Sequence, residues 1–387
     1  MNFDDEINRY GTNSLKYDFK KCKNKPDDVL PMWVADMDFK CCDEVLNDMH
    51  KKINHGILGY SKNDEGYFNS IRNWYLKKFN VKLKQEWLVT IPVVGVALAI
   101  STKILTQEND YVLITNPVYY TFSKIVLDNN RKIISSDLVL KDGHYEIDFE
   151  DFENKIKKYN VKLFLLCSPH NPIGRVWKEY ELNKIIEICS KYKVFIVSDE
   201  VHCDFAWNSQ HICLLKYDDY KDNIILCTSP TKSFNLAGLQ ISNIFIPSEF
   251  IRKKFQRELW NNGYSLINIM GMVACESAYK NGESWLNEIK KYILENIRYT
   301  DRFLKERLPK IKLIYPEGTY LLWLDFNELN LSDDVLESLL LDKAKIWLDG
   351  GKKFGKTGSG FQRLNVALPR KKLKYALESL ERTFKNF

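Results

Sequence analysis

Five short apolar runs, separated by longer polar or amphipathic stretches, constrain the fold of this chain more than any other feature. They are rich in Val, Ile and Leu and read YVLIT (111–115), KLFLLC (162–167), VFIVS (194–198), NIILC (223–227) and SNIFI (242–246). Between two of them, the stretch 179–192 has one apolar helical face, formed by Leu182, Ile185, Ile186, Ile188 and Cys189. Apolar strands that alternate with helices indicate a mostly parallel sheet covered on both faces, so the sequence predicts an α/β fold.

The carboxyl-terminal part follows a different pattern. A long amphipathic helix is expected from about residue 284, and three strand-like runs come after it: YLLWLDF (320–326), AKIWLD (344–349) and FQRLNVAL (361–368). This order predicts a smaller α+β domain. We therefore expect a large domain over 48–283 and a small one from 1–47 and 284–387, with the first residues completing the small domain or reaching a partner subunit.

Composition argues against several classes of protein. The formal charge of +6 is spread along the 387 residues, so we do not expect nucleic-acid binding. No apolar run approaches the ~18 residues of a membrane span, and the acidic start MNFDDEINRYG does not resemble a signal peptide. Nine cysteines, two of them adjacent at 41 and 42, do not form the pattern of a disulfide framework. We expect a soluble, cytoplasmic protein.

Polar residues follow four consecutive apolar runs, at the point where each predicted strand ends. They include Tyr119, Asn171, Asp199 and Lys232. Each has an ordinary explanation by itself, such as a turn, a helix cap or a solvated lysine. Because ligands of open α/β sheets bind beyond the carboxyl ends of the strands, we expect the four side chains to share one site.

These residue types suit a cofactor that carries a pyridine ring, a phosphate and an aldehyde. Lys232 could form a Schiff base with the aldehyde, Asp199 could hold a proton on the ring nitrogen, and Tyr119 could stack on the ring. Ser229 and the helix expected to start in VVGVALAI, at Val94 and Gly95, could supply contacts to the phosphate.

Three motifs resemble fold-type I pyridoxal 5'-phosphate (PLP) enzymes of aminotransferase class I/II: DEVH (199–202), SPHNPIGR (168–175) and SPTKSFNLAGLQ (229–240). A narrower resemblance, to the MalY/PatB-type cystathionine β-lyases, rests on RYGTNSLKYD (9–18), PMWVADMDF (31–39), the histidine at 202 and GSGFQRLNVALP (358–369). It covers nearly the whole chain.

The resemblance implies a role for each matching residue. Lys232 would be the Schiff-base and catalytic lysine, Asp199 the partner of the ring nitrogen, and Tyr119 a stacking and catalytic residue. Asn171 and His202 would donate to the phenolic oxygen of the ring, and Tyr60 would contact the phosphate of a neighbouring subunit. Arg363 would bind the substrate α-carboxylate by a bidentate pair, and Ala35 and Asn171 would also contact the substrate. A homodimer with a shared active site is therefore expected.

Two positions differ from most aminotransferases. Residues 92–95 read PVVG where relatives usually have PGVV, and Gln240 stands where many carry arginine. The β-lyase-like relatives share that glutamine, which favours the narrower resemblance.

Other parts of the sequence resemble functional motifs. GGKKFGKT (350–357) has P-loop spacing, but the glycines and the strand-like run after it oppose the helix that a P-loop needs. His202, Cys203, His211 and Cys213 lack the usual spacing of zinc ligands, so no metal site is expected. Trp33 and Trp323 are candidates to line the substrate pocket, although large aromatic residues usually belong to the core.

The expected function is PLP-dependent β-elimination from L-cystathionine or a related S-substituted cysteine, giving a thiol (homocysteine), pyruvate and ammonia. A class I/II aminotransferase is the first alternative, because it would use the same residues. A catalytically weak PLP-binding regulatory protein is the second, and the complete set of Lys232, Asp199 and Arg363 argues against it.

Overall fold

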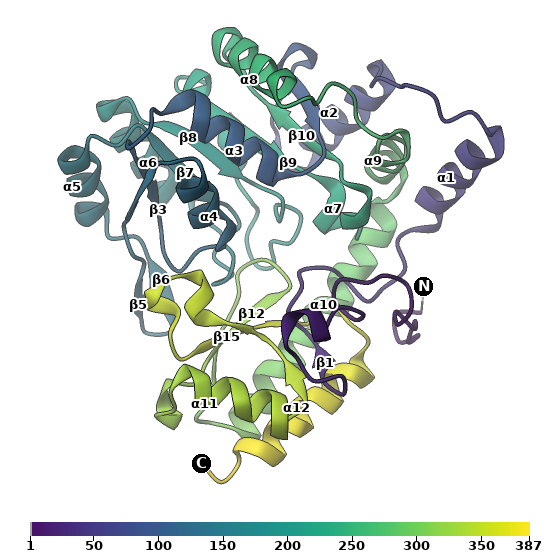
Figure 1. Ribbon diagram of the computed structural model, residues 1–387, viewed down its shortest axis with the longest axis vertical. Coiled ribbons are helices and arrows are strands. Elements are labelled where there is room, and N and C mark those ends of the chain that lie inside the picture. The colour runs from purple at the N-terminus through teal and green to yellow at the C-terminus, as the bar shows by residue number, and fades with distance from the viewer. Residues whose placement is uncertain (1) are drawn as a thin grey trace.

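A seven-stranded sheet forms the centre of the larger part of the molecule (Figure 1). The computed structural model describes residues 2–387. Along the sheet the strands are β2 (Leu88–Ile91), β10 (Ser242–Phe245), β9 (Ile224–Thr228), β8 (Phe195–Asp199), β7 (Leu163–Cys167), β3 (Tyr111–Ile114) and β4 (Lys132–Ser135). All five apolar runs of the sequence are strands of this sheet, and the prediction of a mostly parallel α/β fold is confirmed.

Strand β10 is the exception, since it runs antiparallel to both β9 and β2. The chain between β9 and β10 contains only the four-residue helix α7 (Pro230–Ser233) and the short η5 (Ala237–Leu239). No long crossover helix is present there to return the chain to the other end of the sheet, so it turns back beside β9.

Helices cover both faces of the sheet because both faces of its strands are apolar. In β7, Leu163, Leu165 and Cys167 pack on one side, and Phe164 and Leu166 pack on the other. The first face is covered by α3 (Val94–Leu105), α4 (Thr121–Asp128) and α8 (Glu249–Asn261). The second is covered by α2 (Glu65–Phe79), α5 (Phe149–Tyr159), α6 (Glu179–Tyr192) and α9 (Ile269–Asn281), against which α1 (Asp43–His55) also packs. The helix predicted over 179–192 matches α6 at both ends.

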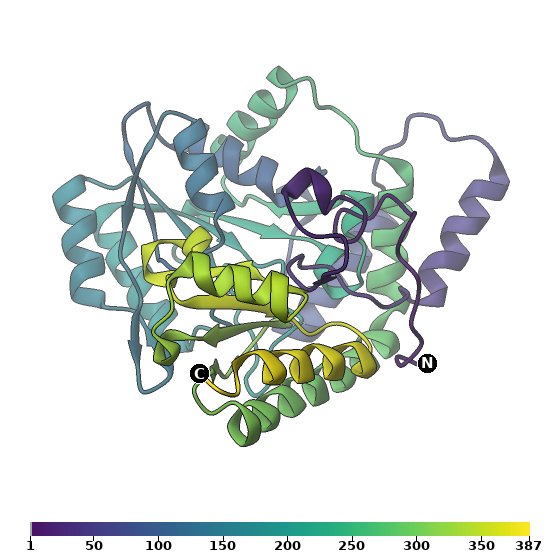
Figure 2. The same cartoon turned by 60° about the horizontal axis from the view of Figure 1, so that its bottom comes forward.

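A second, four-stranded antiparallel sheet lies in the carboxyl-terminal part, in the order β11 (Lys312–Ile314), β12 (Leu321–Asp325), β15 (Phe361–Asn365), β14 (Asp349–Gly350). The long helices α10 (Glu283–Arg307) and α12 (Arg370–Phe384) lie side by side against it (Figure 2). Helix α11 (Asp333–Ser338) also belongs to this part. A separate antiparallel hairpin is formed by β5 (Val139–Lys141) and β6 (His144–Glu146).

The run AKIWLD does not form one strand, as the sequence suggested. Ile346 and Trp347 form β13, which pairs in parallel with the amino-terminal strand β1 (Leu30–Pro31). The last residue of the run, Asp349, begins β14, which pairs with β15, and Leu348 between them belongs to neither strand.

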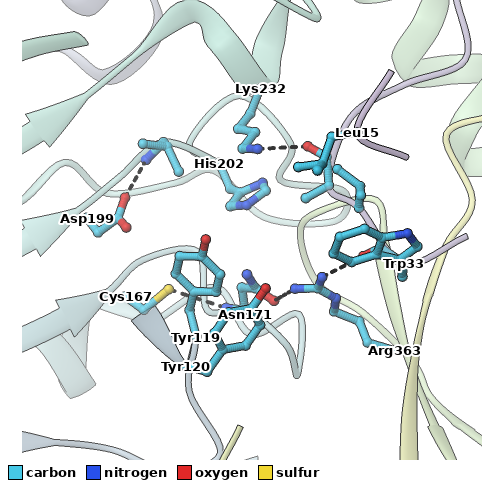
Figure 3. Close-up of a pocket in the computed structure, with 13 residues that line it drawn as sticks. Leu15, Trp33, Tyr119, Tyr120, Cys167, Asn171, Asp199, His202, Lys232 and Arg363 are labelled. Atoms are coloured by element: carbon cyan, nitrogen blue, oxygen red, sulfur yellow. Dashed lines mark hydrogen bonds between the residues drawn. The ribbon is translucent and has the colours of Figure 1, made fainter. Parts of the chain in front are cut away.

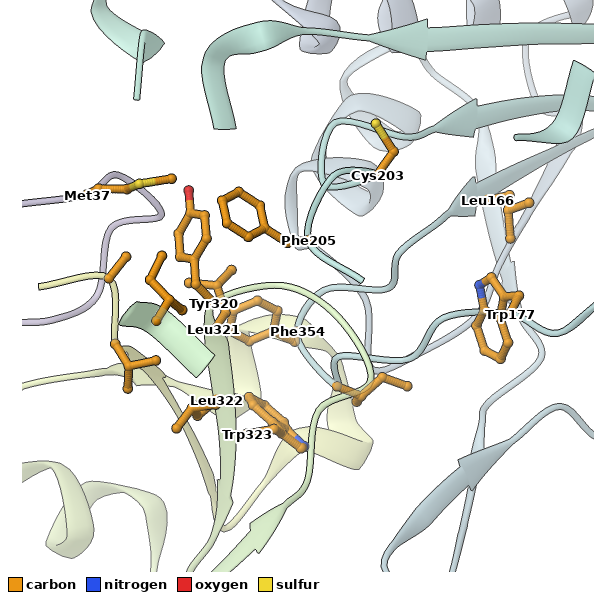
Figure 4. Close-up of a cluster of buried hydrophobic side chains, with 14 of the residues drawn as sticks. Met37, Leu166, Trp177, Cys203, Phe205, Tyr320, Leu321, Leu322, Trp323 and Phe354 are labelled. Carbon is orange, nitrogen blue, oxygen red and sulfur yellow. The ribbon is translucent and has the colours of Figure 1, made fainter. Parts of the chain in front are cut away.

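One buried cluster of hydrophobic side chains joins the two parts of the molecule (Figure 4). Phe205, from the loop after β8, meets Tyr320 edge to face with ring centroids 5.0 Å apart. Trp323 belongs to this core and does not line the substrate pocket, because its ring is fully buried and stacks on Phe361 at 5.2 Å.

Among the helices of residues 2–387, none is both long and apolar enough to cross a membrane. All nine cysteines lie within the described residues, and each is a free thiol.

Candidate active site

A cavity of about 200 Å³ lies where the carboxyl ends of the central strands face the smaller sheet (Figure 3). Its lining brings together most of the residues that the sequence singled out. They are Ala35, Tyr119, Asn171, Asp199, His202, Lys232 and Arg363, joined by Leu15, Trp33, Val34, Tyr120, Cys167 and Val201.

The parallel strands explain why residues so far apart in sequence meet here. Asp199 is the last residue of β8, Asn171 follows β7, and Lys232 lies in α7 directly after β9. Tyr119 follows β3 in the same way. Adjacent parallel strands end at the same edge of a sheet, so each delivers its polar residue to one rim.

Asp199 is a buried carboxyl with few partners. It accepts a hydrogen bond from the Val201 amide at 3.3 Å, and it pairs in register with Cys167 on β7 and Cys227 on β9. Burial raises the pKa of Asp199 to about 6, against the opposing effects of the Val201 amide and the Lys232 charge. A buried carboxylate of this kind calls for a cationic or proton-bearing partner.

Lys232 is held at the other side of the cavity. Its Nζ donates a hydrogen bond to the Ala35 carbonyl at 2.8 Å. Burial lowers the pKa of Lys232 to about 8, although Asp36 and Asp199 act in the opposite direction. An amine with such a pKa is partly neutral near pH 8, and the neutral form is the nucleophile and the base.

His202 and Asn171 line the same cavity. Burial and the nearby charges of Lys232 and Arg363 keep the pKa of His202 well below its usual value, so the imidazole is neutral. Its buried Nδ1 has no hydrogen-bond partner among residues 2–387. Both side chains can offer a hydrogen bond to a ligand in the cavity.

Most hydrogen-bond donors of Arg363 are already used within the protein, which leaves too few for the expected bidentate pair with a carboxylate. Its Nη1 donates to Asn171 Oδ1 at 3.0 Å, and its Nη2 donates to both the Trp33 carbonyl (2.7 Å) and Asp349 Oδ2 (2.8 Å). Its Nε is buried and has no hydrogen-bond partner within residues 2–387. Both edges of a guanidinium include Nη2, so neither edge of Arg363 has two free donors in this arrangement.

Residues 33–37, which we call the strap, contribute Trp33, Val34 and Ala35 to the lining of the cavity. Every carbonyl of the strap accepts a hydrogen bond from a distant side chain: Trp33 from Arg363, Val34 and Asp36 from Asn365, Ala35 from Lys232 and Tyr320, and Met37 from Arg9 and Asn235. Sequence reasoning did not find this role, because a carbonyl acceptor carries no residue-type signal.

A buried charge cluster fixes the end of the strap. Asp38 accepts hydrogen bonds from Arg9 (2.8 Å), Lys16 (3.0 Å) and Tyr17 (2.5 Å), and Arg9 also pairs with Asp36 at 2.7 Å. These partners hold the pKa of Asp38 below its usual value despite burial. The three donors lie in the motif RYGTNSLKYD and Asp38 lies in the motif PMWVADMDF, so both motifs were visible in the sequence although their contact was not.

Four predicted residues lie outside the lining of the cavity. Val94 and Gly95 form the first turn of α3, which has no side-chain cap, and Ser229 caps α7 while its hydroxyl donates to the Ile241 carbonyl at 2.7 Å. Tyr60 is 98% exposed, in the loop between α1 and α2. Their assignment to the phosphate stays a prediction.

The P-loop-like segment 350–357 does not open into an α-helix. It folds into two short 3₁₀ turns, η8 (Gly351–Phe354) and η9 (Lys356–Gly358), and then enters β15. Its backbone amides are therefore not arranged as the phosphate cradle of a P-loop.

The four residues with zinc-ligand chemistry do not form one group. His202 faces the cavity, whereas His211 pairs with Glu200 at 2.7 Å and Cys203 lies 3.7 Å from the Tyr75 hydroxyl. Within residues 2–387, no group of three or more His, Cys, Asp or Glu side chains has a geometry that could hold a metal ion.

The donor set of the cavity fits PLP. Among the described residues 2–387, the buried Asp199 carboxylate has no close cationic partner and the buried Nδ1 of His202 has no hydrogen-bond partner. Lys232, whose pKa is lowered, lines the same cavity. A pyridinium nitrogen, a phenolic oxygen and an aldehyde would satisfy these groups in turn.

Comparison with known proteins gives the family. The model of the family described as aminotransferase class I and II matches residues 27–380. The chain is 39% identical to cystathionine beta-lyase PatB of Bacillus subtilis (strain 168), over 95% of each chain.

Two solved structures share the whole fold. A PLP-bound protein of Clostridium difficile 630, provisionally described as an aminotransferase, superposes with a TM-score of 0.96 at 41% identity, over 99% of each chain. The PLP-bound C-S lyase of Staphylococcus hominis superposes with a TM-score of 0.93 at 32% identity, over 99% of this chain and 98% of that one. The chain belongs to the aminotransferase class I and II family and is a homologue of the PatB/MalY-type carbon–sulfur lyases.

Proposed function

We propose that this protein is a PLP-dependent carbon–sulfur β-lyase that cleaves L-cystathionine or a related S-substituted cysteine. The observation that carries the proposal is the convergence of Lys232, Asp199, His202 and Arg363 on one buried cavity. The lyase relatives at 39% and 32% identity favour elimination as the reaction.

Different residues are proposed to bind different parts of the cofactor. Lys232 would bind the aldehyde, Asp199 would keep a proton on the ring nitrogen, and Tyr119 would contact the ring. Asn171 and His202 would donate toward the phenolic oxygen, and Ser229 and the amides of Val94 and Gly95 at the start of α3 would bind the phosphate.

The bound cofactor supplies an electron sink for a bond broken at the α-carbon of an amino acid. Arg363 holds the α-carboxylate, supported by Asn171 and by Ala35 of the strap. The neutral Lys232 amine would take the α-proton of the substrate, and burial, which lowers the pKa of Lys232 to about 8, favours that neutral form.

Loss of a thiolate from the β-carbon completes the elimination. For L-cystathionine the overall balance is cystathionine plus water giving homocysteine, pyruvate and ammonia. The Lys232 ammonium that results from α-proton transfer would then be the acid that returns a proton to the leaving sulfur.

The active unit proposed is a homodimer in which Tyr60 reaches the phosphate of the partner. The 98% exposure of Tyr60 in the single chain supports this, because an exposed side chain is available to a second subunit. We also propose the division into a large domain, 48–283, and a small one from 1–47 and 284–387, which the pairing of β1 with β13 supports. The free thiols of all nine cysteines suit the cytoplasm.

The test is to incubate the PLP-loaded protein with L-cystathionine in the absence of any keto acid. Pyruvate and free thiol should appear in equal amounts, and Lys232→Ala should produce neither. The same variant should also lose the covalent, borohydride-reducible attachment of the cofactor. Substantial lyase activity in the variant would contradict the role of Lys232.

An aminotransferase is the second candidate, favoured by the provisional description of the Clostridium difficile structure. It would use the same lysine and arginine but would need a keto acid to turn over. Activity that depends on an added keto acid, with no thiol released from L-cystathionine, would replace the lyase by this alternative.

A further inference from the structure

A buried carboxylate holds the arginine that is proposed to bind the substrate. Asp349 and Arg363 lie directly opposite each other on the antiparallel strands β14 and β15, where cross-strand side chains meet. Both side chains are almost fully buried, with 1% and 3% exposed, and their charged atoms are 2.8 Å apart. No residue type in the sequence indicated a role for Asp349.

The segment around Asp349 is built to keep this pair in place. Lys353 donates to the second carboxylate oxygen of Asp349 at 3.0 Å, and the Phe354 ring lies under the Arg363 guanidinium at 4.9 Å. The Phe354 carbonyl in turn accepts from the Val118 amide at 3.0 Å, next to Tyr119. The P-loop-like segment thus connects Arg363 to the large sheet.

The count of donors shows which bond of Arg363 can be exchanged. A carboxylate that binds an edge of the guanidinium needs Nη2, whose two hydrogens go to Asp349 and to the Trp33 carbonyl. Release of Asp349 would leave a buried carboxylate with only Lys353 as a partner, which is costly. Release of the neutral Trp33 carbonyl, which lines the cavity, costs less.

We propose that Asp349 is a positioning residue for substrate binding. It anchors one hydrogen of Arg363 Nη2 and thereby orients the guanidinium so that the α-carboxylate of the substrate replaces the Trp33 carbonyl. This inference rests on the proposed role of Arg363, and it applies to a lyase and to an aminotransferase alike.

The experiment measures binding and not turnover. The PLP-loaded protein is titrated by calorimetry with L-alanine, which has an α-carboxylate, and with L-alaninamide, which lacks the charge. In Asp349→Ala the Kd for L-alanine should rise at least about tenfold, because an unsupported guanidinium samples other orientations, while the Kd for L-alaninamide changes less than about twofold. Lys352→Ala, an exposed neighbour in the same segment, is the matched control and should leave both values unchanged.

Asp349→Asn separates orientation from charge and is the safer variant for folding. Its amide oxygen can still accept from Arg363, so L-alanine should bind as tightly as to the parent protein, or more tightly because an internal negative charge is gone. The proposal is overturned if this variant binds L-alanine more than threefold more weakly, or if Asp349→Ala weakens both ligands equally or neither. A parent protein that binds no L-alanine would contradict the proposed function itself.

Discussion

The sequence predicts which residues share the site but not which groups these residues contact. That Tyr119, Asn171, Asp199 and Lys232 share one cavity follows from strand ends that are visible in the sequence. Their partners do not follow, since Lys232 bonds to a carbonyl 197 residues away and Arg363 to one 330 residues away. A backbone carbonyl looks the same at every position of a sequence, so only the fold identifies these acceptors.

We expect the buried charge of Asp199, which the proposed function needs, to lower the stability of the folded protein. Its folded-state pKa of about 6 lies above the ordinary value of 3.8, so its neutral form is favoured by folding and the stability of the cofactor-free protein falls as pH rises through this interval. Asp199→Asn removes the buried charge. The variant should be more stable by about 3 kcal/mol at pH 8 and by about half as much at pH 5.

Urea unfolding of the cofactor-free protein at both pH values checks this expectation. The loaded variant should lose most of its activity, because an amide cannot hold a proton on the ring nitrogen. A gain in stability that is the same at pH 5 and pH 8 would show that the buried charge is not its cause.

The sequence predicted an element correctly where that element packs against one partner. The prediction was wrong where two parts of one run pair with different strands. Helix α6 matches its prediction because one apolar face meets one side of the sheet. The run AKIWLD divides because β13 joins the amino-terminal β1 whereas β14 joins β15. Periodicity within a run of six residues contains no information about which distant strand will pair with it.

The glycines of the segment 350–358 provide a test at this scale. A Cβ on Gly358 would lie 2.2 Å from the Gly351 carbonyl oxygen, whereas a Cβ on Gly350 would meet nothing closer than 3.9 Å. Gly358→Ala should therefore destabilise the protein by about 1–3 kcal/mol and also raise the KM for the amino acid, since the segment supports Arg363. Gly350→Ala should change the stability by less than about 0.5 kcal/mol.

Thermal unfolding and steady-state kinetics on the pair give the answer. Equal effects of the two substitutions would mean that the close approach of η8 and η9 does not decide the conformation of the segment.

At the scale of the whole molecule, the two parts were expected from the change in pattern near residue 284, but the way they are joined was not. The amino-terminal residues contribute a strand to the carboxyl-terminal part, the strap to the cavity, and the donors that surround Asp38. Contacts between the two ends of a chain arise from packing and have no local signature in the sequence.

The proposed dimer predicts how two inactive variants will combine. The protein should have a mass of about twice the 45.6 kDa of one chain in light scattering. If Tyr60 serves the partner's phosphate, a heterodimer of Lys232→Ala and Tyr60→Ala contains one intact site. An equal mixture that exchanges subunits freely should then recover about a quarter of the parent activity. No recovery, in a mixture shown to exchange, would assign Tyr60 to its own subunit or to neither.

The strap also bears on how this protein would respond to systematic mutagenesis. The carbonyls of residues 33 and 35 accept hydrogen bonds from Arg363 and Lys232. These carbonyls belong to the backbone, which keeps the same peptide group whichever amino acid is encoded. A library that replaces each side chain in turn leaves both acceptors present, so tolerance at these positions would report only the loss of the indole or the methyl group. Replacing the peptide link by an ester, which weakens the carbonyl as an acceptor, would reveal the contribution that genetic variation cannot reach.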